Sequence, residues 1–240
     1  MNDTARIPPE LTWTPELVAR FWDWQSRFPE AYFAYQFGAG IAERLAPHIA
    51  GARTVLDFGC GSGAFMARLL AGGVKVAGCD VSPRSIEATR VRNEGHPNFA
   101  GTGTAAAFLE SGTKFDAIVA TETVEHVYDD QLDAILDLMR KLAAPGARIV
   151  FTTPNRENLS EAAVYCPVAD VTFHRWQHVR SWSAETLSDH MRARGFASVV
   201  IEETDFSVSA RRYALHRAMS ALRGRERARP HLLGVFTPAD

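Results

Sequence analysis

The chain reads VLDFGCGSG at residues 55–63, where a short apolar run leads into three alternate glycines and an amphipathic run starts at Ala64. Glycine has no side chain, so a loop of this kind can bend tightly and let its backbone approach a ligand near the positive end of the following helix. The stretch therefore predicts a strand, a ligand-binding turn and a helix, in that order.

The same alternation of short apolar and longer amphipathic segments continues beyond this loop. Strands are predicted at TVLDF (54–58), VKVAGCD (74–80), NFAGT (98–102), FDAIVA (115–120) and ARIVFTT (147–153), with helices at 64–71, 82–93 and 131–142. A long connection, residues 154–182, precedes a helix started by Ser183 and two closing strands at 196–203 and 231–237. This order is typical of an α/β, Rossmann-like doubly wound sheet, which binds ligands beyond the carboxyl ends of its strands. The length of the connection suits a role in substrate binding.

The composition favours one domain. The chain has 240 residues, of which 46% are hydrophobic, and it contains no internal repeat or low-complexity linker. We expect residues 1–240 to form one domain, with a helical cap at 1–50 and the core at 51–240. Lys and Arg number 26 against 28 Asp and Glu, so no overall positive field favours nucleic acid.

The cysteines and the apolar runs indicate the compartment. Cys60, Cys79 and Cys166 are odd in number and lack Cys-x-x-Cys spacing, which disfavours a disulfide framework or a thiolate zinc site. The chain has neither a leader pattern at MNDTARIPPE nor an apolar run of about 18 residues. We therefore expect a cytoplasmic protein with no membrane insertion.

Two acids show what the glycine loop binds. Gly59, Gly61 and Ala64 also fit the G-x-G-x-x-G/A dinucleotide pattern, so a nicotinamide or flavin oxidoreductase is one alternative. Asp57 stands two residues before the first glycine, where a carboxylate suits a cationic amino-acid group better than a pyrophosphate. Asp80 ends the next strand, where its oxygens can accept both ribose hydroxyls. Together they favour a nucleoside that carries an amino-acid tail.

With VLDFGCGSG and VAGCD, the chain resembles the class I S-adenosylmethionine-dependent methyltransferases. The resemblance spans roughly residues 40–237, about the extent of one domain. It implies a seven-stranded sheet whose last strand is antiparallel between the fifth and sixth, and S-adenosylmethionine as cofactor. The implied cofactor-binding residues are Asp57, Gly59, Gly61, Gly63, Asp80, Val81, Thr104 and Thr121. Thr102 and Gly103 would lie near the adenine, although the acid that the family often has in this region is absent here.

A cluster of polar residues follows the fourth strand in TETVEHVY, residues 121–128. If this is the first turn of a helix, Glu122, Glu125 and His126 lie on one face. His126 could then remove the acceptor's proton as a general base, or the three side chains could bind a divalent ion that lowers the acceptor's pKa. A purely structural role is the third alternative, in which the acids favour a helix start and His126 packs in a wall.

Two subgroups of the family resemble the chain in this region. The ubiquinone-biosynthesis O-methyltransferases have a similar Glu-x-x-Glu-His turn and a similar FTTPNR segment. The small-RNA 3′-terminal 2′-O-methyltransferases share the turn and a later His-x-x-x-Trp, like His178 to Trp182, and bind a magnesium-type ion. That resemblance implies the metal ligands Glu122, Glu125, His126 and His178, with His174 in reserve. Both subgroups methylate one of two neighbouring oxygens, which implies a vicinal diol or catechol-like acceptor.

The leading expectation is O-methylation of a hydroxyl on a small-molecule or glycan acceptor, with His126 and Glu122 as catalytic residues. Methylation of an RNA 3′ end is the nearest alternative, favoured by the arginines of residues 211–229. A solvated helix face is the other explanation of those arginines. An oxidoreductase and a non-catalytic cofactor-binding partner of another enzyme are rivals from different classes. Among the N-terminal aromatics, Trp22 or Tyr35 could stack on the acceptor as part of a lid, or could simply pack the first helix onto the sheet.

Overall fold

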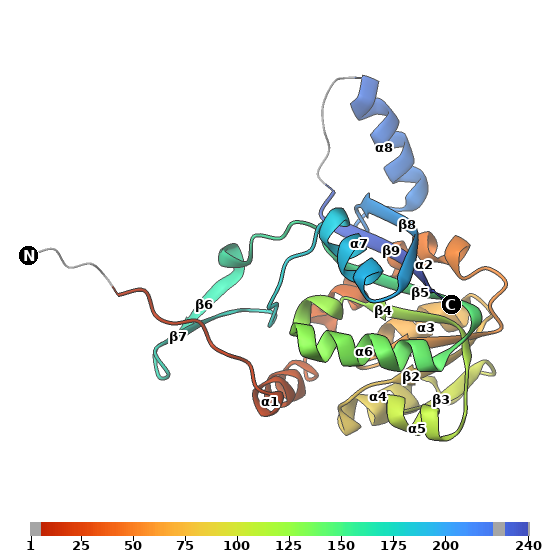
Figure 1. The fold of residues 1–240 in the computed structure, drawn as a ribbon, viewed down its shortest axis with the longest axis horizontal. Coiled ribbons are helices and arrows are strands. Elements are labelled where there is room, and N and C mark those ends of the chain that lie inside the picture. Colours follow the sequence, from red (N-terminus) through yellow and green to blue (C-terminus); the bar gives the residue numbers. More distant parts are fainter. Residues whose placement is uncertain (1–5, 223–228, 240) are drawn as a thin grey trace, which may run out of the picture.

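The computed structural model describes residues 6–222 and 229–239, which are built around a seven-stranded sheet (Figure 1). The strands are β1 (Thr54–Phe58), β2 (Lys75–Cys79), β3 (Phe99–Gly103), β4 (Phe115–Thr121), β5 (Ala143–Pro154), β8 (Phe196–Thr204) and β9 (His231–Pro238). Their order is β3-β2-β1-β4-β5-β9-β8. Strand β9 is antiparallel to both of its neighbours, whereas β1 to β5 are parallel. The predicted fold, including the position of the last strand, is confirmed.

Helices cover both faces of this sheet. Side chains of α5 (Ala105–Glu110), α6 (Asp129–Leu142) and α7 (Ala184–Ala193) pack on one face, and those of α2 (Phe33–Leu45) and α3 (Ala64–Ala71) pack on the other. Successive residues of β1 serve the two layers, because Leu56 faces the first and Val55 the second. Such two-sided burial explains why the parallel strands are nearly continuous apolar runs.

Local sequence signals set the helix boundaries. Helix α3 has the predicted bounds, and α4 (Pro83–Asn93) begins after Ser82, whose hydroxyl accepts a hydrogen bond from the amide of Ser85. Helix α6 starts at Asp129, two residues before the predicted position. Short 3-10 helices η1 (Pro29–Ala31) and η2 (Ala46–His48) flank α2.

An arm projects from one side of the molecule, where the sequence predicted only a long connection (Figure 1). After η4 (Leu159–Ala162), strands β6 (Ala163–Cys166) and β7 (Val171–His174) form an antiparallel hairpin. The N-terminal segment pairs with its outer edge, since the amide of Leu11 donates to the carbonyl of Thr172. Helix α1 (Pro15–Gln25) then leads from the arm back to the sheet.

Helix α8 (Ala210–Leu222) projects from the β8 side of the sheet (Figure 1). Arg211 and Arg212 are exposed at its start, whereas Arg223, Arg225 and Arg227 lie outside the described residues. Arg229 pairs with Glu203 at 3.3 Å. None of the helices that the structure describes is long and apolar enough to cross a membrane.

Candidate active site

The glycine loop crosses the carboxyl end of β1, where the order of the parallel strands reverses between β1 and β4. Gly59, Gly61 and Gly63 have φ angles of +75°, +52° and +73°, which L side chains rarely adopt. The amide of Gly59 donates to the carbonyl of Cys79 at 2.8 Å, and α3 begins directly after Gly63. The loop therefore turns sharply and presents backbone next to a helix N-terminus.

The carboxylate of Asp80, the predicted ribose-binding group, is held by backbone amides. One carboxylate oxygen accepts from the amide of Gly61 at 3.0 Å and the other from the amide of Ser82 at 2.9 Å. Each oxygen keeps one lone pair, so both hydroxyls of a ribose can still be accepted. Tyr32, which no sequence motif singled out, lies beside Gly61. Its pKa is raised to about 12, by burial and then by the charge of Asp80.

Asp57 lies under the loop with 2% of its surface exposed. Its Oδ2 has no hydrogen-bond partner among the described residues. Burial, followed by the charge of Asp80, raises its pKa to about 7. A buried carboxylate with a free oxygen is stabilised by a cationic partner, and the ammonium group of an amino-acid tail is one.

The other cofactor candidates lie around the same edge. Val81 follows Asp80 and is 94% exposed, so its side chain is available to a flat ring. Thr104 caps α5 by accepting from the amide of Ala107. Thr121 ends β4 with a buried hydroxyl that has no partner in the described part of the chain. Beside it, a Cβ on Gly59 would come within 3.1 Å of the Thr123 hydroxyl.

We expect Asp57→Asn to stabilise the protein at high pH. The folded-state pKa of about 7 exceeds the ordinary value of 3.8. The stability contributed by this group is therefore complete below about pH 4 and is lost as pH rises through 7. The melting temperature should rise more at pH 8 than at pH 5, and S-adenosylhomocysteine should stabilise the variant less than the wild type.

Asp116→Asn is the control, because the pKa of Asp116 is lowered whereas that of Asp57 is raised. Burial alone would raise the pKa of Asp116, but hydrogen bonds from the backbone of Arg53 and Thr54 lower it. This variant should lose stability near neutral pH. An equal gain for Asp57→Asn at both pH values would contradict the assignment.

The turn after β4 differs from the predicted first turn of a helix. Glu122 has a left-handed φ of +50°, Val124–His126 form the 3-10 helix η3, and α6 starts only at Asp129. The expectation that Glu122, Glu125 and His126 share one helical face is therefore wrong. The amide of Glu122 continues the sheet by donating to the carbonyl of Thr152, which delays the helix.

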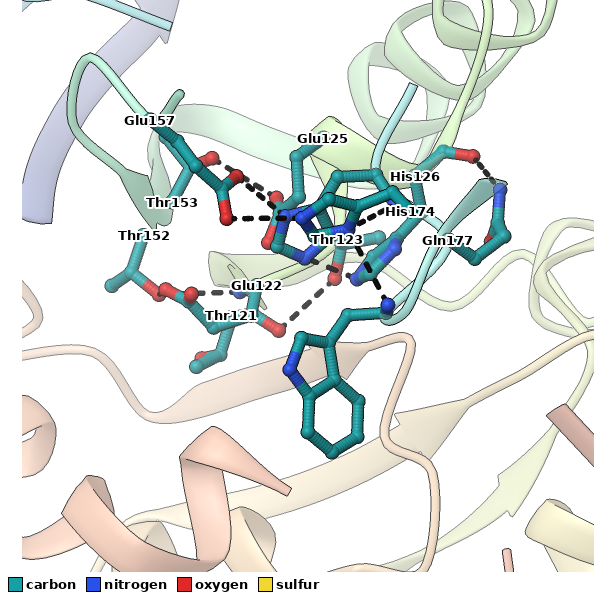
Figure 2. A network of polar contacts seen from close by, with 12 residues as sticks. Thr121, Glu122, Thr123, Glu125, His126, Thr152, Thr153, Glu157, His174 and Gln177 are labelled. Carbon is teal, nitrogen blue, oxygen red and sulfur yellow. Dashed lines mark hydrogen bonds and ion pairs between the residues drawn. The ribbon is translucent and has the colours of Figure 1, made fainter. Parts of the chain in front are cut away.

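Each acid of this turn is held by a threonine of β5 (Figure 2). The hydroxyl of Thr152 donates to Glu122 Oε1 at 2.8 Å, and that of Thr153 donates to Glu125 Oε2 at 3.0 Å. Burial is the largest cause of the raised pKa values of both acids, and the pKa of Glu122 reaches about 8. The charge of Glu122 further raises the pKa of Glu125. Both carboxylates are desolvated, and their negative charges repel each other. A cation at this position would therefore stabilise their charged forms.

Glu125, His126 and His178 meet in one cluster. Each offers one ligand atom, and these atoms lie within 4.8 Å of one another. Glu125 Oε1 and His126 Nδ1 are buried without a hydrogen-bond partner among the described residues. The backbone joins the two segments as well, since the amide of Val179 donates to the carbonyl of Glu125 at 2.9 Å. Of the four predicted metal ligands, the structure brings these three together and leaves Glu122 at their side.

Trp22 of α1 and Gln177, which follows β7, contact His126. The indole N–H of Trp22 donates to Gln177 Oε1 at 2.9 Å, and Gln177 Nε2 donates to the carbonyl of His126 at 2.8 Å. The ring of Trp22 meets that of His126 edge-on at 4.8 Å between centroids. Of the two aromatics considered for a lid, Trp22 thus lies at the site, whereas Tyr35 is 47% exposed.

The sequence motifs did not single out two residues of this site. Glu157 pairs with His178, with 2.6 Å between Oε2 and Nδ1, and Gln177 is fully buried with a φ of +63°. An acid shortly after the end of β5 could have been noticed, because the carboxyl ends of neighbouring strands meet at one edge. Gln177 lies in a connection whose path depends on tertiary contacts.

The comparisons with known proteins agree with this geometry. Residues 28–201 match the family model described as "Methyltransferase domain". The ubiquinone biosynthesis O-methyltransferase of Paracidovorax citrulli is 31% identical over 160 residues, 65% of this chain and 66% of that protein. Its counterpart in Cereibacter sphaeroides is 31% identical over 179 residues, 68% of this chain and 70% of that protein. The chain thus matches just under two thirds of the length of the Paracidovorax relative.

Solved structures show the same fold. The 1,6-didemethyltoxoflavin-N1-methyltransferase of Burkholderia thailandensis superposes with a TM-score of 0.66 over 97% of this chain and 94% of its own. That structure contains its acceptor and S-adenosylhomocysteine, and its sequence is 15% identical to this chain.

Proposed function

We infer that this chain, which belongs to the class I S-adenosylmethionine-dependent methyltransferases, methylates a hydroxyl oxygen of a small acceptor with the help of a divalent cation. One observation carries the proposal. In a buried cluster at the end of β4, Glu125 Oε1 has no hydrogen-bond partner among the described residues and lies 3.8 Å from His126 Nε2, with His178 beside them. Among proteins of one fold, the site chemistry indicates the reaction more directly than the fold does.

The two parts of the site would have different roles, one in cofactor binding and one in methyl transfer. The glycine loop, Asp57 and Asp80 would hold the cofactor, and the end of β4 would face the methyl group. In the reaction the acceptor oxygen forms a bond to the methyl carbon, the carbon–sulfur bond breaks, and the hydroxyl proton must leave. The protein has to align the oxygen with the carbon and to favour loss of that proton.

The surroundings of His126 favour cation assistance over a free imidazole base. Burial, and then electrostatic repulsion between this imidazole and that of His178, lower the pKa of His126 to about 3. An imidazole with so low a pKa is a weak acceptor for a hydroxyl proton at neutral pH.

A divalent ion would lower the pKa of a bound hydroxyl and fix its oxygen in place. Glu125, His126 and His178 would hold it, and Glu122 would add negative charge from the side. Oxygen and imidazole ligands together suit magnesium, manganese or a similar ion.

The same site supports an acceptor with two neighbouring oxygens. The ubiquinone-biosynthesis enzymes that the chain is similar to are named as O-methyltransferases. A catechol can chelate one cation through both oxygens, whereas its mono-O-methyl ether does so poorly. The ring of Trp22 contacts that of His126 edge-on, and would offer an aromatic surface to such an acceptor.

A panel of acceptors tests this function. With methyl-labelled S-adenosylmethionine, we expect turnover of a catechol at least about tenfold faster than of a monophenol, since chelation aligns the reacting oxygen. An aromatic amine and a short RNA with a free 3′ end complete the panel. Faster labelling of the amine, or labelling of the RNA that weakens steeply with salt, would overturn the proposal in favour of that acceptor.

A further inference from the structure

Glu157 and His174, both labelled in Figure 2, form a second acid–imidazole group. Their ligand atoms and one of His178 lie within 4.8 Å of one another. We propose that these two are positioning residues, which fix His178 in the tautomer that leaves its Nε2 free for the cluster of Glu125 and His126. The inference deepens the proposed function and rests on it for the chemistry. It stands on the two backbone hydrogen bonds to His174, on the hydrogen bond between Glu157 and His178, and on the close contact of Glu157 with His174.

The tautomer of His174 follows from its contacts. Its Nδ1 accepts from the amide of Trp176 at 3.3 Å and from the amide of His178 at 3.2 Å. A neutral imidazole carries one hydrogen, so an accepting Nδ1 places that hydrogen on Nε2. The Nε2 atom is buried and has no hydrogen-bond partner among the described residues, and it lies 3.4 Å from Glu157 Oε1, so its hydrogen is next to that carboxylate without a formed hydrogen bond.

The carboxylate of Glu157 also contacts His178. Glu157 Oε2 lies 2.6 Å from His178 Nδ1. Because the carboxylate accepts, Nδ1 of His178 carries the hydrogen and its Nε2 keeps a lone pair. The rings of His174 and His178 stack at 4.4 Å between centroids, and the ring of His126 lies 4.8 Å from that of His178. A carboxylate behind a ligating histidine fixes the ring in this way at many metal sites.

This arrangement decides which histidine can be a ligand. Glu157, His174 and His178 offer a second group of atoms within 4.8 Å. However, Nε2 of His174 carries the hydrogen and the lone pair of Nδ1 is used by two amides, so His174 has no lone pair for an ion. His178 is therefore the ligand and His174 the group that orients it through Glu157. This removes His174 as the reserve metal ligand.

Imidazole NMR tests the tautomers without any cation. Long-range ¹H–¹⁵N spectra of the cation-free protein, assigned with His174→Asn and His178→Gln, should show the hydrogen on Nδ1 of His178 and on Nε2 of His174. In Glu157→Ala the preference at His178 should be lost. A wild-type His178 with its hydrogen on Nε2, or a His174 with its hydrogen on Nδ1, would overturn the inference.

Two substitutions of His174 separate positioning from support of the loop. The amide of Gln can replace the Nε2–H group that faces Glu157, whereas the side-chain oxygen of Asn can replace Nδ1 and accept from the amides of Trp176 and His178. Positioning predicts that His174→Asn and Glu157→Ala weaken Mn²⁺ binding about 10- to 100-fold. It also predicts that His174→Gln stays within about threefold of the wild type, even where its melting temperature falls. Glu161→Ala, which removes an exposed acid nearby, is the control.

Imidazole NMR and Mn²⁺ binding together distinguish a failure of the positioning role from a failure of the cation site. Wild-type tautomers as expected without Mn²⁺ binding would refute the cation in the proposed function and leave the positioning of His178 standing. Mn²⁺ binding that is unchanged in His174→Asn and Glu157→Ala would refute the positioning role and leave the cation site standing.

Discussion

Glu125→Gln is expected to lower kcat/KM for methyl transfer by about 10²- to 10³-fold, as loss of one directed electrostatic contact does in other active sites. The residue is 1% exposed, and Oε2 accepts from the hydroxyl of Thr153 while Oε1 has no hydrogen-bond partner among the described residues. Glutamine has the same shape and can keep the contact with Thr153. The loss would therefore reflect the missing charge.

The measurement is a rate at saturating S-adenosylmethionine with a catechol acceptor, together with the stabilisation by S-adenosylhomocysteine. That stabilisation should not change, since Glu125 lies outside the glycine-loop half of the site. Glu185→Gln alters an exposed acid of α7 and should leave both quantities unchanged. A Glu125→Gln variant with wild-type turnover would remove the cluster from the reaction.

Gly63→Ala is expected to destabilise the protein by about 2–5 kcal/mol, the sum of a left-handed backbone and an overpacked contact. Its φ is +73°, and an added Cβ would lie 2.6 Å from Asn93 Nδ2 and 2.9 Å from Thr89 Cγ2. Both neighbours are buried on α4, so they have little room to move. Cofactor affinity should fall too, because the loop turns at this residue.

Gly112→Ala is the matched control for the backbone cost. Gly112 has a φ of +70°, and an added Cβ would meet nothing within 4 Å among the described residues. Chemical denaturation should show a loss of about 1–2 kcal/mol for this variant, from the left-handed conformation alone. Equal losses for the two variants would mean that the contact with α4 adds nothing.

The fold was predictable because each of its signals is local. The apolar runs of β1, β4 and β5, the glycines at 59–63 and the cap of Ser82 depend on residues a few positions apart. The place of the antiparallel last strand, between the fifth and sixth, followed from the family resemblance. The bounds of α3 came out as predicted, and the single domain with a cap at 1–50 stays a prediction.

The site was less predictable because tertiary contacts assemble it. The amide of Glu122 prefers the carbonyl of Thr152 to a helical turn, which no periodicity within 121–128 could show. Trp22, Gln177 and Glu157 reach His126 and His178 from distant segments. The hairpin of β6 and β7 did have a signal, since the runs AVYC and VTFH flank a short segment with Pro167 and Asp170.

The dependence of catechol methylation on a divalent cation tests the central claim most directly. The wild-type protein, freed of metal with a chelator and then titrated with Mn²⁺, should regain turnover with a stoichiometry of one ion per chain. Binding of S-adenosylhomocysteine should stay the same throughout. Full catechol turnover in excess chelator, with no gain on adding Mn²⁺, would contradict the account.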